Sequence, residues 1–153
     1  MSDNVREARK NIASEIGADI SYFTPAEERR FEPVTIALTL GGILLYEFCK
    51  AMVKKIGEKL GEAAGESLGD AIVEAIKKAV AGGSEHADIE SAVREWTKTV
   101  EAHRLTGAQM AEAADYVEKV IENALVRQQR MPYDRAHRIA HRVRLEVLRV
   151  KAG

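Results

Sequence analysis

Two histidines near the C-terminus have the spacing of metal ligands on a helix. His137 and His141 are four residues apart, and Asp134 lies three residues before His137, so a helix would bring all three onto one face. Arg138 and Arg142 flank them, and a cation among arginines is electrostatically unfavourable unless carboxylates from another element join it. The chain has no HExxH motif and a single cysteine. We therefore interpret this segment as a solvated or partner-facing basic helix and predict no metal site.

The rest of the sequence offers no convincing catalytic group. We recognise no nucleophile elbow, no phosphate-binding P-loop and no dinucleotide-binding GxGxxG motif. Cys49 lies in an apolar stretch, where an inert buried thiol is the usual outcome. Glu62 and Glu66 belong to a regular column of acids, not to an acid and a base set apart by their surroundings. We predict a non-enzymatic protein with no cofactor and no small-molecule substrate.

Composition indicates an ordered helical protein with almost no net charge. The 153 residues are 46% hydrophobic, 31% charged and 5% aromatic, which suffices for one domain with a real core. The net charge of −1 provides no overall field that attracts nucleic acid or anionic membrane. One cysteine excludes an internal disulfide, and the polar start lacks the apolar segment of a signal peptide. We expect a cytoplasmic protein and leave attachment to a membrane surface open.

Hydrophobic periodicity, capping boxes and breakers predict an all-α bundle of about five helices in a single domain over residues 1–153. We expect a first helix over 3–20, one long central helix over 34–81, a helical pair over 85–131 and a basic C-terminal helix over 133–151. Residues 34–40 and 143–147 alternate with period two, which is typical of strands. We favour helix for both, because two short isolated strands make a poor sheet.

A four-residue repeat dominates the long central helix. From residue 56 to residue 80 the first position is always apolar, and the second is glycine four times in succession. On a helix this pattern makes a smooth glycine groove beside an aliphatic ridge. Each interior glycine costs roughly 1 kcal/mol relative to alanine, so the groove predicts that another backbone packs closely here. The predicted packing residues are Gly57, Gly61, Gly65, Gly69, Ile56, Leu60, Leu68 and Ile72.

These tetrads resemble the glycine zipper, GxxxGxxxGxxxG, a motif of closely packed helices in membrane-associated and self-assembling proteins. The resemblance covers residues 57–69 and their flanks, and it implies a homo-oligomer. The third position of the tetrads is acidic from Glu58 to Glu74, and like charges four residues apart are unfavourable unless a basic surface faces them. The C-terminal helix is the candidate for that surface, in the same chain or in a neighbouring one.

An apolar segment precedes the glycines. Residues 34–46 carry no formal charge, and apolar residues continue beyond Glu47. A membrane-spanning helix needs roughly 20 apolar residues, and a shorter run is more typical of a core or of an interfacial segment. We favour the core on length, although Lys50, Lys54 and Lys55 lie where an interfacial helix keeps its cations. The candidates for membrane or partner contact are Ile36, Leu38, Leu40, Ile43, Leu44, Leu45 and Phe48.

The C-terminal helix concentrates positive charge on adjoining turns, at Arg135, Arg138, Arg142 and Arg149. Such a surface can neutralise phosphates of nucleic acid, lipid headgroups or an acidic protein. Our leading hypothesis is a non-enzymatic, self-assembling helical protein with a membrane-interacting or membrane-perturbing segment. The alternative is a helical binding or adaptor module that recognises nucleic acid or an acidic protein through this arginine-rich helix.

Overall fold

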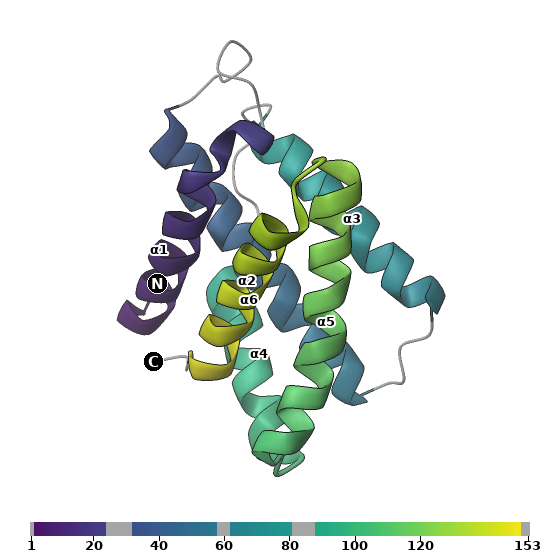
Figure 1. The fold of residues 1–153 in the computed structure, drawn as a ribbon. Coiled ribbons are helices and arrows are strands. Elements are labelled where there is room, and N and C mark those ends of the chain that lie inside the picture. Colours follow the sequence, from purple (N-terminus) through teal and green to yellow (C-terminus); the bar gives the residue numbers. More distant parts are fainter. Residues whose placement is uncertain (1, 24–31, 58–61, 81–87, 151–153) are drawn as a thin grey trace.

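The computed structural model describes residues 2–23, 32–57, 62–80 and 88–150. Within these ranges all regular structure is helical, which confirms the predicted all-α bundle. The elements, labelled in Figure 1, are α1 (Asp3–Ala18), the short 3-10 helix η1 (Ile20–Tyr22), α2 (Pro33–Gly57), α3 (Glu62–Val80), α4 (Ile89–Ala102), α5 (Gly107–Gln128) and α6 (Tyr133–Arg149). Residues 34–40 and 143–147, which alternate with period two, are helical parts of α2 and α6.

Helix α2 lies at the centre of the bundle and packs against α1, α3, α4, α5 and α6. In Figure 1 it crosses behind α5 and α6. Its large, fully buried side chains are Ile36, Leu40, Leu44, Leu45, Phe48 and Met52. A helix that is apolar around most of its circumference is stable in water only when neighbours cover it, so the other helices are arranged around this one.

The segment expected to form one helix over residues 34–81 forms two. Helix α2 ends at Gly57, α3 begins at Glu62, and residues 58–61 lie outside the described ranges. One continuous helix would be roughly 70 Å long, more than twice the diameter of a small domain. Instead, α3 packs against both α2 and α5. Of the apolar tetrad positions with described side chains, Ile72 and Ile76 are buried, and Ile56, Leu68 and Val80 pack partly buried against the core. Glycine is also a preferred residue where a helix ends.

A close approach of two helix backbones occurs between α1 and α2, at Gly41. A Cβ atom on Gly41 would lie 2.9 Å from the carbonyl oxygen of Arg9 and 3.1 Å from the amide nitrogen of Ala13. The Arg9 side chain also donates from Nε to the carbonyl oxygen of Leu38 at 2.7 Å. The absence of a side chain at Gly41 therefore lets α1 lie directly on α2.

Helices α5 and α6 form an antiparallel hairpin (Figure 1). The predicted capping box is present, because Thr106 Oγ1 accepts from the Gln109 amide and the Gln109 side chain accepts from the Thr106 amide. The connecting turn places Arg130 at a positive φ of 53°, and Pro132 follows as the N-cap of α6. Proline cannot continue the preceding helix, so the turn fixes which residues of α5 and α6 lie opposite each other.

Candidate functional site

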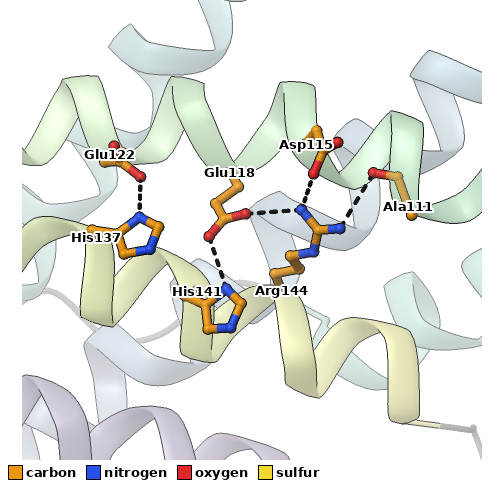
Figure 2. Close-up of polar contacts among 7 residues, drawn as sticks. All are labelled: Ala111, Asp115, Glu118, Glu122, His137, His141 and Arg144. Atoms are coloured by element: carbon orange, nitrogen blue, oxygen red, sulfur yellow. Dashed lines mark hydrogen bonds and ion pairs between the residues drawn. The ribbon is translucent and has the colours of Figure 1, made fainter.

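Two acids and two histidines face each other across the α5–α6 hairpin, as Figure 2 shows. Glu118 and Glu122 occupy successive turns of α5, and His137 and His141 occupy successive turns of α6. Because the helices are antiparallel, Glu122 lies opposite His137, and Glu118 lies opposite His141. We call these four residues the carboxylate–histidine cluster.

Each acid of the cluster contacts one imidazole. The distance from Glu122 Oε2 to His137 Nδ1 is 2.8 Å, and that from Glu118 Oε1 to His141 Nδ1 is 3.1 Å. Both glutamate side chains are 9% exposed, whereas both histidine side chains are 49% exposed. An ionised carboxylate only accepts hydrogen bonds, so Nδ1 of each neutral imidazole donates and Nε2 carries the lone pair.

Arg144 holds Glu118 from the other side. Its Nη1 donates to Glu118 Oε2 at 2.9 Å and to Asp115, and its Nη2 donates to the carbonyl oxygen of Ala111 at 3.5 Å (Figure 2). Burial lowers the pKa of Arg144, but the hydrogen bonds to Asp115 and Glu118 outweigh that effect and raise it. Arg144 therefore remains a cation and turns the second oxygen of Glu118 towards His141.

The two imidazoles form a ladder of rings with Tyr133. The Tyr133 ring stacks on His137 at a centroid distance of 5.8 Å, and the His137 ring stacks on His141 at 5.7 Å. Hydrogen bonding to Glu122 raises the pKa of the Tyr133 phenol. Stacking and the Nδ1 contacts together restrict the orientation of both histidine rings.

The cluster has the donor atoms and the charge of a cation site. One ligand atom each of Glu118, His137 and His141 lies within 4.8 Å of the other two. Two imidazole nitrogens and a carboxylate oxygen are a ligand set that zinc and related divalent metals prefer. Asp115, Glu118 and Glu122 against Arg144 give a formal balance of −2, which offsets the charge of a divalent ion.

Sequence reasoning found the two histidines but not their partners. Asp134, which shares the spacing of the two histidines in the sequence, does not belong to the group of possible ligands, whereas Glu118 does. The usable signal was the pair Glu118 and Glu122, four residues apart on the helix before the turn. In an antiparallel hairpin Glu122 is as far from the turn as His137, and Glu118 is as far from it as His141. This correspondence can be derived only when the position of the turn is known.

The predicted glycine face is only partly described. A Cβ atom on Gly57 or Gly69 would meet no atom of another described element within 4 Å. Gly61 and Leu60 lie outside the described residues, and so do the surroundings of Gly65. Of the aliphatic neighbours, Ile72 is buried, and Ile56 and Leu68 pack partly buried against the core.

Residues 65–69 match the pattern GxSxG, which we did not identify from the sequence. A nucleophile elbow needs its serine on a sharp turn between a strand and a helix. Ser67 instead lies inside α3, a continuous helix from Glu62 to Val80. The string therefore has no elbow geometry here.

The apolar candidates of α2 form the core of the fold. Among the described residues, α2 is the one helix long and apolar enough to cross a membrane, and 67% of its most apolar stretch is buried inside the bundle. Leu38 is partly buried. The other six candidates are between 0% and 8% exposed: Ile36, Leu40, Ile43, Leu44, Leu45 and Phe48.

Three of the four arginine candidates form ion pairs within the chain. Arg135 Nη1 lies 3.0 Å from Asp19, and Arg149 Nη2 donates to both oxygens of Glu146 at 2.6 and 2.7 Å. A third, Arg142, lies 3.5 Å from Glu15 and 3.8 Å from Glu146. Arg138 is exposed, and no ion pair to it is found among the described residues. The partners of these arginines are thus Glu15 of α1, Asp19 directly after α1 and Glu146 of α6, whereas we had expected them in the acidic column from residue 58 to 74.

A groove runs between α3 and α5 beside Gly69. It has a volume of about 310 Å³. We call it the α3–α5 groove; it is lined by Gly69, Asp70 and Val73 from α3 and by Val120, Asn123, Ala124, Arg127 and Gln128 from α5. Asp70 and Arg127 are exposed, so the two helices contribute opposite charges to one groove.

No protein-family model, curated protein or solved structure matches the chain.

Proposed function

We propose that the protein is a non-enzymatic helical module that self-associates through the α3–α5 groove. The observation that carries this proposal is the α3–α5 groove itself, in which open space at Gly69 lies beside exposed Asp70 and Arg127. The glycine-zipper pattern and the missing catalytic motifs agree with it. The partner is a second copy of this chain.

The energetic argument compares two helical glycines. Gly41 lies in the interior of α2 and has a packing reason inside the fold, because a Cβ atom there would press on the backbone of α1. Gly69, in the interior of α3, has no such contact with the described residues. It still costs roughly 1 kcal/mol relative to alanine. A helix of a second copy lying against Gly69 offsets that cost through close packing.

Charge complementarity favours a second copy as the partner. Two-fold symmetric association brings the same surface of both copies together. Asp70 and Arg127 belong to one groove, so a two-fold axis through it places Asp70 of each copy near Arg127 of the other. Opposite charges in such positions favour the correct register and suppress others.

Sedimentation equilibrium over a concentration series tests the proposal. The wild type is expected to associate reversibly. Gly69→Leu fills the space that the partner helix needs, so we expect the dissociation constant to rise at least tenfold. Gly17→Leu is the matched control, since Gly17 is an exposed helical glycine whose Cβ position is also open, and it should leave association unchanged.

A charge exchange provides the sharper control. Asp70→Arg and Arg127→Asp should each weaken association, because each places like charges opposite one another, and the double variant should restore it. A wild type that stays monomeric at every concentration contradicts the proposal. So does association that Gly69→Leu leaves unchanged.

Membrane perturbation is the second candidate function, and the length and apolar composition of α2 favour it. In the bundle the apolar side chains of α2 are covered by other helices. Contact with lipid would therefore require the bundle to open. The arginine-rich helix supports a nucleic-acid partner less well, since Arg135, Arg142 and Arg149 already pair with acids of the same chain.

A further inference from the structure

We propose that Glu118, His137 and His141 form a binding site for a divalent transition-metal ion, with zinc as the best match. The site is separate from the α3–α5 groove, because the histidines belong to α6 and the groove is lined by α3 and α5. It does not depend on self-association.

The first argument for this site is the spacing of its ligand atoms. Glu118 Oε1 and His141 Nδ1 are 3.1 Å apart, close to the roughly 3.4 Å between two ligands of a tetrahedral ion with bonds of about 2.1 Å. His137 supplies the third ligand atom within the same 4.8 Å group. Coordination of one ion requires these atoms to approach from within 4.8 Å to roughly 3.4 Å of one another.

The second argument for this site is that Glu122 orients His137. Its carboxylate accepts from His137 Nδ1 at 2.8 Å, which leaves the lone pair on Nε2, and Figure 2 shows that this nitrogen lies on the side facing Glu118 and His141. A carboxylate behind a ligating imidazole fixes its tautomer and raises its basicity as a ligand. Glu122 is thus a positioning residue and not a ligand.

The His141 ring loses one proton and gains one when the ion binds. In the metal-free protein His141 Nδ1–H donates to Glu118 Oε1. When the ion binds, Nδ1 gives up this proton to solvent and coordinates, and the ring takes a proton on its other nitrogen. Glu118 Oε2 continues to accept from Arg144 throughout.

The exposure of the two histidines leaves one coordination position of the ion open to solvent. Three protein ligands are a set that leaves a fourth tetrahedral position of zinc open. Both histidine side chains are 49% exposed, so solvent reaches that position and the ion has an entry path.

Calorimetric titration of Zn²⁺ into chelator-treated full-length protein tests the site, with Co²⁺ as an optical probe of tetrahedral coordination. We expect one ion per chain. His137→Gln, His141→Gln and Glu118→Gln should each lower the affinity at least tenfold, and Glu122→Gln should lower it roughly 10- to 100-fold. His103→Gln is the matched control, since this exposed histidine lies at the end of α4, and it should bind like the wild type.

A second measurement separates loss of a ligand from loss of the fold. The circular dichroism of the histidine variants should match that of the wild type, because both rings are half-exposed. Zn²⁺ should shift the ¹⁵N resonances of His137 and His141 but not those of His103. No binding at micromolar to millimolar Zn²⁺ overturns the proposal, and so does equal affinity in the wild type and in the double variant His137→Gln/His141→Gln.

Discussion

Buried acidic side chains accept hydrogen bonds that connect the helices of this bundle. Asp19, Glu118, Glu122 and Glu146 are the buried charged residues of the described chain, and each accepts from a cation or an imidazole. Glu146 also accepts from the side chain of Asn11 on α1 at 3.0 Å. A buried charge without such partners is strongly destabilising. The conformations of α1, α5 and α6 are therefore tied together by these contacts.

Glu47 on α2 provides a test by pH at the scale of one residue. Burial raises its pKa, and the nearby Lys50 and Lys54 only partly oppose this effect. The folded state therefore binds the proton more tightly than the unfolded state does, and stability is lost as the pH rises from the unfolded pKa through the raised folded pKa. Glu47→Gln should raise the melting temperature above this range and leave it unchanged below.

Thermal unfolding at about pH 4 and at about pH 7 measures this difference. Glu95→Gln is the matched control, because Glu95 is an exposed helical glutamate on α4, and it should show no comparable gain at the higher pH. A Glu47→Gln variant that melts below the wild type at neutral pH would show that the charge of Glu47 is stabilised in the fold.

At the scale of elements, local signals were sufficient for some helices and insufficient for others. The capping box at Thr106 and the break at Pro132 are set by neighbouring residues, so the sequence predicted α5 and α6 closely. The boundary between α2 and α3 lies within an unbroken tetrad repeat. Local periodicity favours continuation there, whereas compact packing of α3 on α2 and α5 requires the chain to turn.

The candidate site shows the same limit. The two histidines were recognisable because their spacing is local. Glu118 and Glu122 can be identified as partners of the histidines only from the register of the α5–α6 hairpin, which depends on tertiary packing. The pairing of Arg135 with Asp19 joins residues of α6 and of the segment after α1, and no periodic pattern indicates such a contact.

The contact of α1 with α2 gives a test of helix packing. Gly41→Ala places a Cβ atom 2.9 Å from a backbone oxygen and 3.1 Å from a backbone nitrogen of α1, and neither can move independently of its helix. We expect a loss of about 1–3 kcal/mol in the free energy of unfolding. Urea denaturation measures it.

Gly17→Ala supplies the comparison. Its Cβ position is open, so the substitution should be neutral or should stabilise the protein by up to about 1 kcal/mol. Equal effects of the two substitutions would mean that α1 and α2 do not approach as closely in solution.

At the scale of the whole molecule, the central position of α2 decides between a core and a membrane segment. In the closed bundle the wild type should neither float with liposomes nor release dye from them. Gly41→Ala loosens the cover that α1 gives to α2, so it should increase both if membrane perturbation is a function of the chain. Flotation with neutral and anionic liposomes at low and high salt, with dye-loaded vesicles in parallel, measures this.

The salt dependence identifies the contact. Binding that high salt removes and that releases no dye is attachment through surface arginines. If neither protein binds either type of liposome, the membrane function is excluded and α2 is a core helix only.

The position of α2 in the chain has a consequence for synthesis in the cell. Helix α2 is the second α-helix to leave the ribosome, yet its neighbours α4, α5 and α6 follow only later in the sequence. At roughly 5–20 residues per second, the roughly 90 residues up to the end of α6 take on the order of 5–20 s to make. During that interval the nascent chain presents an apolar helix that only α1, and then α3, can cover. Chaperone binding to nascent chains should therefore be strongest after α2 has emerged and should end when α6 is complete.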